Sequence, residues 1–259
     1  MRIKTSLIFI ILINSFNFIF SQDCIADDST EGIQIFGNCF SIQNTDTLIK
    51  TNQFIGGNLP EELGQLINLT YLDLSDNNFS GSIPSSIGNL SNLEHLDLSN
   101  NSSGFMWFID DGIDLVPPEI GNLSNLRFLN LERCFISEIP IEMANLINLD
   151  TLKLSSNPFG NYSDYYNNVD TFQSPLPTIY SITNLKRLEL SFCLISDSIH
   201  SEIANLDQLE HLNLWGNELY GEIPDEFWSL TNLISVDLGG SIGGFFSPAA
   251  KNNLTGIIS

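Results

Sequence analysis

The sequence predicts an α/β fold built as a solenoid, in which short units stack into one parallel β-sheet and turns return the chain over the convex side. Three observations predict it. A leucine pattern begins seven times, at residues 69, 93, 126, 149, 185, 209 and 233. Apolar and polar residues alternate after each start, as in a strand that buries one face. An asparagine or a cysteine follows eight positions after six of the seven starts.

The clearest unit, residues 69–90, reads LTYLDLSDNNFSGSIPSSIGNL. Leu72, Leu74, Asn77 and Phe79 fill the pattern LxxLxLxxNxL, and the unit that begins at residue 209 repeats it. A single unit of this length cannot bury its own leucines. Neighbouring units therefore stack, and their leucines form one continuous core.

The asparagine row has a physical reason. Backbone groups at the turn after each strand face the interior, and a side-chain amide offers them both donors and an acceptor. The row consists of Asn77, Asn101, Asn157 and Asn217, with Cys134 and Cys193 at the same position of two further units. These cysteines are two units apart, roughly 10 Å at the usual strand spacing, and a disulfide tolerates only about 7 Å. We therefore expect buried structural thiols that form no bridge.

Residues 1–21 have the pattern of a secretory signal peptide. Arg2 and Lys4 precede a largely apolar run over residues 7–20, and Ser21 is a small residue that suits cleavage. A membrane anchor is the competing interpretation. The run has 14 residues and polar interruptions, whereas a span needs about 20 apolar residues, so we favour cleavage.

The start of the mature chain is predicted to be a cap. Cys24 and Cys39 are 15 residues apart, and we expect a disulfide between them, because an exported chain can form one and the exposed end of a solenoid needs closing. Residues 33–40 imitate the strand and turn of a repeat. We assign residues 22–58 to the cap with a short first repeat, and residues 59–259 to the repeat array.

The composition excludes two classes of protein. The chain has 259 residues with 9 basic and 31 acidic side chains, and its formal charge of −22 makes a phosphate-neutralising nucleic-acid binder an unsuitable assignment. Its 42% apolar residues and 18 phenylalanines exceed what a disordered polyanion contains. A folded acidic protein is expected.

The residues after the asparagine carry a resemblance to a known family. Residues 79–90 read FSGSIPSSIGNL, and residues 219–224 read LYGEIP. The pattern resembles the plant-type leucine-rich repeat, LxGxIPxxLGxL, found in the ectodomains of receptor-like kinases and receptor-like proteins and in secreted polygalacturonase inhibitors. The resemblance implies a right-handed horseshoe with a concave parallel sheet, 3-10 turns and loops on the convex side, a second short sheet, and binding of proteins, peptides or glycans at the concave face.

The chain departs from this pattern in two places. His200 stands where the pattern has proline, and the paired cysteines of the usual C-terminal cap are missing. Residues 252–259 begin another unit, so we expect an array that stops in mid-unit. A receptor role would then require a longer parent protein.

The side chains beside the buried leucines should face solvent on the concave side, at positions 71, 73, 75 and 76 and their equivalents. The middle units place basic and aromatic residues there, types that carry much of the binding energy at interfaces. We predict a ligand-binding strip of Phe128, Arg133, Lys153, Arg187, Phe192, His211 and Trp215, with Arg187 and Phe192 beside His211 and Trp215. The alternative is that these are isolated exposed aromatics, which are normal on any surface.

The long units predict three loops that leave the same edge of the solenoid. Their aromatic residues include Phe105, Trp107, Tyr165, Tyr166 and Phe245, which we predict as a second recognition surface, because loops on a rigid scaffold often carry function. The alternative is that the aromatics fold back onto the solenoid as a satellite cluster.

Glycosylation sequons are numerous. We predict acceptors at Asn68, Asn78, Asn89, Asn122, Asn161 and Asn253, with Asn78 and Asn161 favoured because they lie in expected loops. Several sequons follow from the repeat itself. Asn101 is also in a sequon, but its place in the buried row makes it a poor acceptor.

We predict no catalytic, metal or cofactor site. Catalysis needs converging titratable residues, and the three histidines, His95, His200 and His211, lie in separate units. We expect a secreted or cell-surface module that binds an extracellular protein, peptide or glycan and not nucleic acid. The alternatives are a secreted inhibitor of a wall-degrading hydrolase and a structural surface protein.

Overall fold

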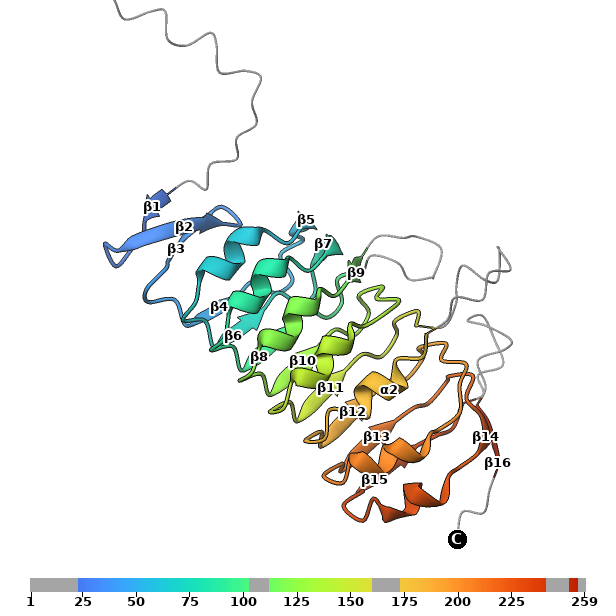
Figure 1. Cartoon of the computed structure of the whole chain (residues 1–259). Helices are drawn as coiled ribbons and strands as arrows, with labels where there is room; N and C mark the ends of the chain where they lie inside the picture. The colour runs from blue at the N-terminus through green and yellow to red at the C-terminus, as the bar shows by residue number, and fades with distance from the viewer. Residues whose placement is uncertain (1–22, 103–111, 160–172, 241–251, 256–259) are drawn as a thin grey trace, which may run out of the picture.

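The computed structural model describes residues 23–102, 112–159, 173–240 and 252–255. The predicted signal peptide, residues 1–21, lies outside these residues. The described part is a curved array of stacked units, with a sheet on one side and coiled turns on the other (Figure 1). The expected solenoid is confirmed.

The main sheet has eight parallel strands in the order β15-β13-β12-β11-β10-β8-β6-β4. Each strand has three residues, and the middle one is an aliphatic residue, which is buried in every strand except β15, where Val236 is 43% exposed. In chain order they are β4 (Thr47–Ile49), β6 (Tyr71–Asp73), β8 (His95–Asp97), β10 (Phe128–Asn130), β11 (Thr151–Lys153), β12 (Arg187–Glu189), β13 (His211–Asn213) and β15 (Ser235–Asp237). The central leucines from Leu48 to Leu212 are at most 2% exposed, and they pair in register across the sheet.

The convex side consists of short turns that begin after a proline in most units. In the described residues the 3-10 helices are η1 (Glu61–Gln65), η2 (Ser85–Asn89), η3 (Pro118–Asn122), η4 (Ile141–Asn145), η5 (Ser201–Asn205) and η6 (Asp225–Ser229), and they are joined by a short α-helix, α2 (Leu176–Ile179). At η5 the preceding residue is His200, which has φ −83° and ψ 157°, the same extended backbone as the prolines before the other 3-10 helices. The histidine therefore changes the side chain without changing the path.

Short strands beside the main sheet form the second sheet that the family resemblance implies. They are β5 (Gly56–Asn58), β7 (Asn78–Ser82) and β9 (Ile113–Leu115) in one part, and β14 (Tyr220–Glu222) and β16 (Asn253–Thr255) in another. All of these pairings are parallel.

The N-terminal segment corrects one expectation. Residues 33–40 do not form the strand and turn of a repeat, but belong to an antiparallel sheet of β1 (Asp23–Ile25), β2 (Glu31–Ile35) and β3 (Asn38–Ser41). Phe36 and Gly37 have φ values of +51° and +76°, the geometry of a tight hairpin turn. Cys24 and Cys39 form the predicted disulfide, with a Cα–Cα distance of 6.1 Å.

The asparagine row is a ladder of buried amides. Asn157 accepts hydrogen bonds from the backbone N–H groups of Cys134 and Ile136 and donates to the carbonyls of Leu131 and Leu154. Asn77, Asn101 and Asn217 bridge neighbouring units in the same way, and Asn252 adds a further rung beyond the predicted row.

Cys134 and Cys193 occupy two rungs as free, buried thiols, as predicted. Their Sγ atoms donate to the carbonyls of Leu98 and Leu154, at 3.0 and 3.3 Å. Burial raises the pKa of both thiols, that of Cys193 to about 12. Because the thiolate is the nucleophilic form, these cysteines are structural groups.

Candidate functional site

The candidate site is the solvent-facing side of the main sheet. The first residue of each strand lies beside the first residue of the next, so Phe128, Thr151, Arg187, His211 and Ser235 form one row across five strands. Adjacent parallel strands are about 4.8 Å apart, which keeps neighbouring side chains in contact. The predicted strip therefore lies on one continuous surface.

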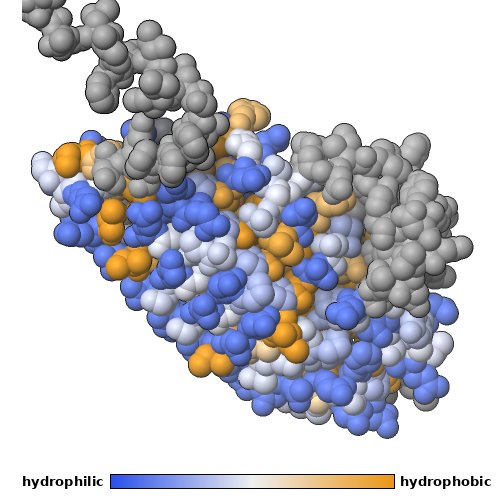
Figure 2. Space-filling view, turned by 45° about the horizontal axis from the view of Figure 1, so that its top comes forward, coloured by the Kyte–Doolittle hydropathy of each residue, from blue (hydrophilic) through white to orange (hydrophobic). Residues whose placement is uncertain are grey.

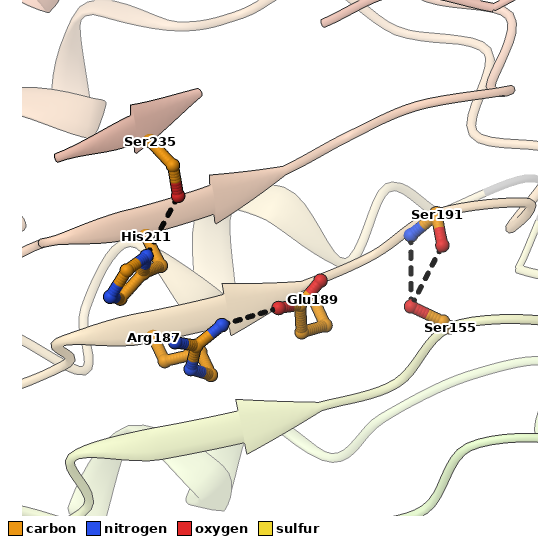
Figure 3. Close-up of polar contacts among 6 residues, drawn as sticks. All are labelled: Ser155, Arg187, Glu189, Ser191, His211 and Ser235. Atoms are coloured by element: carbon orange, nitrogen blue, oxygen red, sulfur yellow. Dashed lines mark hydrogen bonds and ion pairs between the residues drawn. The ribbon is translucent and has the colours of Figure 1, made fainter. Parts of the chain in front are cut away.

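The C-terminal part of this row is held by polar contacts (Figure 3). Arg187 reaches along its own strand to Glu189, with a 3.0 Å ion pair, and His211 Nδ1 lies 2.7 Å from the Ser235 hydroxyl of the next strand. Past the ends of the strands, at the right of the view, Ser191 donates to the Ser155 hydroxyl through its backbone N–H, at 3.1 Å. The predicted basic side chain of Arg187 is thus already paired within the chain.

Phe192 and Trp215 form an aromatic pair at the end of this surface. Their ring centroids are 4.4 Å apart in an edge-to-face arrangement, and the Phe192 N–H donates to the Trp215 carbonyl at 2.9 Å. The repeat register predicts Arg187 and Phe192 beside His211 and Trp215, and the strand pairing and this ring contact confirm that placement.

The backbone at Phe192 adopts a conformation that bulky residues rarely take. The residue before each of six rungs has positive φ: Asp76, Asn100, Arg133, Ser156, Phe192 and Gly216. Small or glycine-like residues suit this position, whereas a phenylalanine with φ +55° and an arginine with φ +53° are strained there. Two of the predicted binding residues therefore occupy positions where the fold itself favours Gly or Asn.

A second aromatic group lies in the N-terminal part of the sheet. Tyr71 stacks on His95 with centroids 4.1 Å apart, His95 stacks on Phe128 at 4.2 Å, and Lys153 Nζ lies 5.9 Å from the Phe128 centroid. Phe128 and Lys153 belong to the predicted binding strip, whereas Tyr71 and His95, at the equivalent concave positions of earlier units, were not included in it. The signal was present, because all three rings begin successive strands.

Partial burial shifts the pKa of two side chains in this region, His95 and Glu132. Burial lowers the pKa of His95 below 6.5, although Asp97 and Asp73 act in the opposite direction. Burial also raises the pKa of Glu132, a shift that Lys153 opposes. A neutral His95 is the form that burial favours, which suits a ring stacked between two others.

Two columns of the predicted surface are wrong in part, because Asn130, at a position equivalent to 73, is buried, and so are three residues of the next column. Positions equivalent to 75 were expected to face solvent, yet Ser75, Ser99 and Ser155 are buried. Their small hydroxyls are paired with neighbouring polar side chains: Ser75 Oγ donates to Asp73 Oδ1 at 2.7 Å, and Ser99 Oγ donates to Asp97 Oδ1 at 2.6 Å. Trp215, in the same column, is half-buried. Arg133, which follows strand β10 of its unit, is exposed.

The predicted edge-loop residues Phe105, Trp107, Tyr165, Tyr166 and Phe245 lie outside the described residues. The predicted acceptor Asn161 does as well. The other predicted acceptors, Asn68, Asn78, Asn89, Asn122 and Asn253, are exposed. Asn68 Nδ2 already donates to the Gln43 carbonyl at 2.8 Å, so its amide also ties two units together. Asn101, by contrast, is fully buried.

Hydrophilic residues cover most of the face seen in Figure 2, with apolar residues in separate groups between them. In the described ranges, no three His, Cys, Asp or Glu side chains gather as metal ligands would. A search of the same residues finds no helix with the length and apolarity of a membrane span.

Family models for the leucine-rich repeat match residues 67–104, 92–123, 125–146, 184–206 and 208–230. No curated protein sequence matches the chain. Among solved structures, the plant peptide hormone receptor RGFR1 in complex with RGF2 is 29% identical with a TM-score of 0.59, covering 75% of this chain and 28% of that one. The Arabidopsis receptor kinase HAESA, in complex with the peptide hormone IDA and the co-receptor SERK1, is 28% identical with a TM-score of 0.61, covering 76% and 30%.

A bacterial structure is similar as well. A leucine-rich-repeat protein of Leptospira interrogans is 29% identical with a TM-score of 0.58, covering 74% of this chain and 43% of that one. The chain thus spans less than a third of the two plant receptor structures that it matches and less than half of the bacterial protein.

Proposed function

We propose that this chain, a leucine-rich-repeat protein, is an extracellular binding module that recognises a peptide or protein partner on its concave face. It would act as a secreted protein or as part of a longer cell-surface receptor. The similarity to plant receptor ectodomains solved with peptide hormones supports this class of partner.

The observation that carries the proposal is the aromatic pair of Phe192 and Trp215. A phenylalanine at φ +55° costs stability at a position where the other units, apart from the one with Arg133, use Asn, Asp, Ser or Gly. Strained bulky residues persist where another role retains them, and tryptophan is among the residue types that dominate binding energy. With Arg187 and His211 on the adjacent strands, the pair supplies an aromatic and polar surface on a rigid sheet.

A matched pair of tryptophan variants tests the proposal. Trp228 lies on the convex turn η6 and packs edge-to-face on Phe227, much as Trp215 packs on Phe192, with interplanar angles of 80° and 83°. The full chain is used to capture its partner from extracellular fluid, and the affinity of that partner is then measured for Trp215→Ala and Trp228→Ala.

We expect Trp215→Ala to weaken binding about 30-fold or more, the effect of losing roughly 2 kcal/mol at an interface hot spot. Trp228→Ala should bind as the unchanged chain does. Combining Arg187→Ala with Trp215→Ala should abolish capture while the circular dichroism spectrum stays the same. Equal affinity for all three proteins would refute the concave site.

A further inference from the structure

Two carboxylates face each other in the N-terminal half of the sheet. Asp73 in β6 pairs in register with Asp97 in β8, so their backbones are about 4.8 Å apart. Like charges at directly opposed positions destabilise a strand pair. Among the described residues, the ion pairs are those of Arg187 with Glu189 and His200 with Asp197, so neither Asp73 nor Asp97 has a basic partner there.

The two carboxylates differ in how their oxygens are used. Asp97 Oδ1 accepts the N–H and hydroxyl of Ser99, and Asp97 Oδ2 accepts Asn130 Nδ2 at 2.9 Å. Asp73 Oδ1 accepts the equivalent bonds from Ser75. Asp73 Oδ2 receives no donor from the described residues. The reason is the residue opposite on the next strand: β10 places the Asn130 amide opposite Asp97, whereas β8 places the Asp97 carboxylate opposite Asp73.

The aromatic stack beside these carboxylates has two different ends. At one end, Lys153 Nζ lies over the Phe128 ring. At the other end, Tyr71 adjoins β4, whose first residue, Thr47, has a side chain too short to cover a phenol ring. Ile49, the register partner of Asp73, is 54% exposed on the same strand.

We propose that Ile49, Tyr71, Asp73 and Asp97 form a surface that binds a lysine or arginine side chain of a peptide or protein partner. This inference rests on the proposed function and assigns a chemistry to one part of the concave face. The aliphatic part of the ligand side chain lies on Ile49, and its charge lies against Tyr71 and the open oxygen of Asp73. The bound cation relieves the repulsion between the two carboxylates.

A short peptide can test the surface without knowledge of the natural partner. The probe is an acetylated, amidated glycine peptide with a central arginine, and the control replaces that arginine by citrulline, which has the same shape and no charge. Binding to the full chain is followed by NMR or calorimetry. We expect the arginine peptide to bind and the citrulline peptide to bind at least tenfold more weakly.

The chain offers a matched control for the carboxylate. Asp237 occupies the same strand position in β15 and accepts the N–H of Gly239 at 3.0 Å, but its register partner is Asn213 and not a second carboxylate. Asp73→Asn should weaken the arginine peptide about tenfold, while Asp237→Asn leaves it unchanged. Equal effects of the two substitutions, or equal binding of the two peptides, would overturn the proposal.

Two further measurements distinguish this surface from a metal site and from the general acidity of the chain. Tyr71→Phe keeps the ring and should bind, whereas Tyr71→Leu should not; thermal unfolding confirms that each variant is folded. Calcium alone, added in place of the peptide, should neither bind at Asp73 nor compete, and a calcium site there would overturn the inference. If Trp215→Ala leaves partner capture intact while peptide binding depends on Asp73, the result refutes the proposed site at Trp215. The same result supports the surface at Asp73.

Discussion

The N-terminal and C-terminal halves of the concave face rest on the same ladder but balance their charges differently. In the C-terminal half, Arg187 is paired with Glu189 and His211 with Ser235, so the polar groups satisfy one another. In the N-terminal half, Asp73 faces Asp97 beside a stack of rings. In the described residues, the carboxylates that lack a basic partner on the concave face thus include Asp73 and Asp97, and these are the groups that we propose bind a ligand.

The largest expected effect comes from breaking the ladder that supports both halves. Asn157→Ala removes four hydrogen bonds to buried backbone groups and should lower the free energy of unfolding by about 3 kcal/mol or more. Cys134→Ala, the matched change at a thiol rung, should cost about 1 kcal/mol. Chemical denaturation followed by circular dichroism gives both values, and equal losses would contradict the distinct role of the amide.

A smaller effect, on the pH dependence of stability, is expected in the N-terminal half. Because burial lowers the pKa of folded His95 below 6.5, the unfolded chain binds the proton more readily between the two pKa values. Stability should therefore be complete above about pH 6.5 and fall as the pH decreases through the folded pKa. His95→Phe keeps a stacked ring and should remove this part of the pH dependence. NMR titration of His95 measures the pKa directly, and a value above 6.5 would reverse the sign.

The smallest effect on stability is expected in the C-terminal half. Phe192→Gly relieves a strained φ, worth about 1 to 3 kcal/mol, but loses the ring contact with Trp215, worth about 0.5 to 1.5 kcal/mol. The net change should lie within about 1 to 2 kcal/mol of zero, while partner binding falls. The converse variant, Gly216→Ala, should be destabilising, because its φ is +70° and the new Cβ would lie 3.0 Å from the Phe192 ring.

The repeat spacing predicted the backbone better than it predicted the side-chain contacts. Leucines and asparagines at fixed positions determine the strand register. A shift of one unit against the next would expose its leucines to solvent and leave its asparagine without hydrogen-bond partners. The stacking of Tyr71 on His95 depends on rotamers that the pattern does not specify. The pairing of Arg187 with Glu189, two residues along one strand, is equally local and was not anticipated. The hairpin at Phe36 and Gly37 was not predicted, because its alternating isoleucines look like a repeat strand.

The thiol rungs have a consequence for how the protein is made. Four cysteines can form two disulfides in three different ways. The structure contains a single bridge, between Cys24 and Cys39, and leaves Cys134 and Cys193 as free thiols. Synthesis delivers Cys24 and Cys39 well before Cys134 and Cys193, and their separation of 15 residues makes a short loop that closes readily. The later thiols then enter the core as their units stack. The order of synthesis therefore favours the bridge between Cys24 and Cys39 over the other pairings.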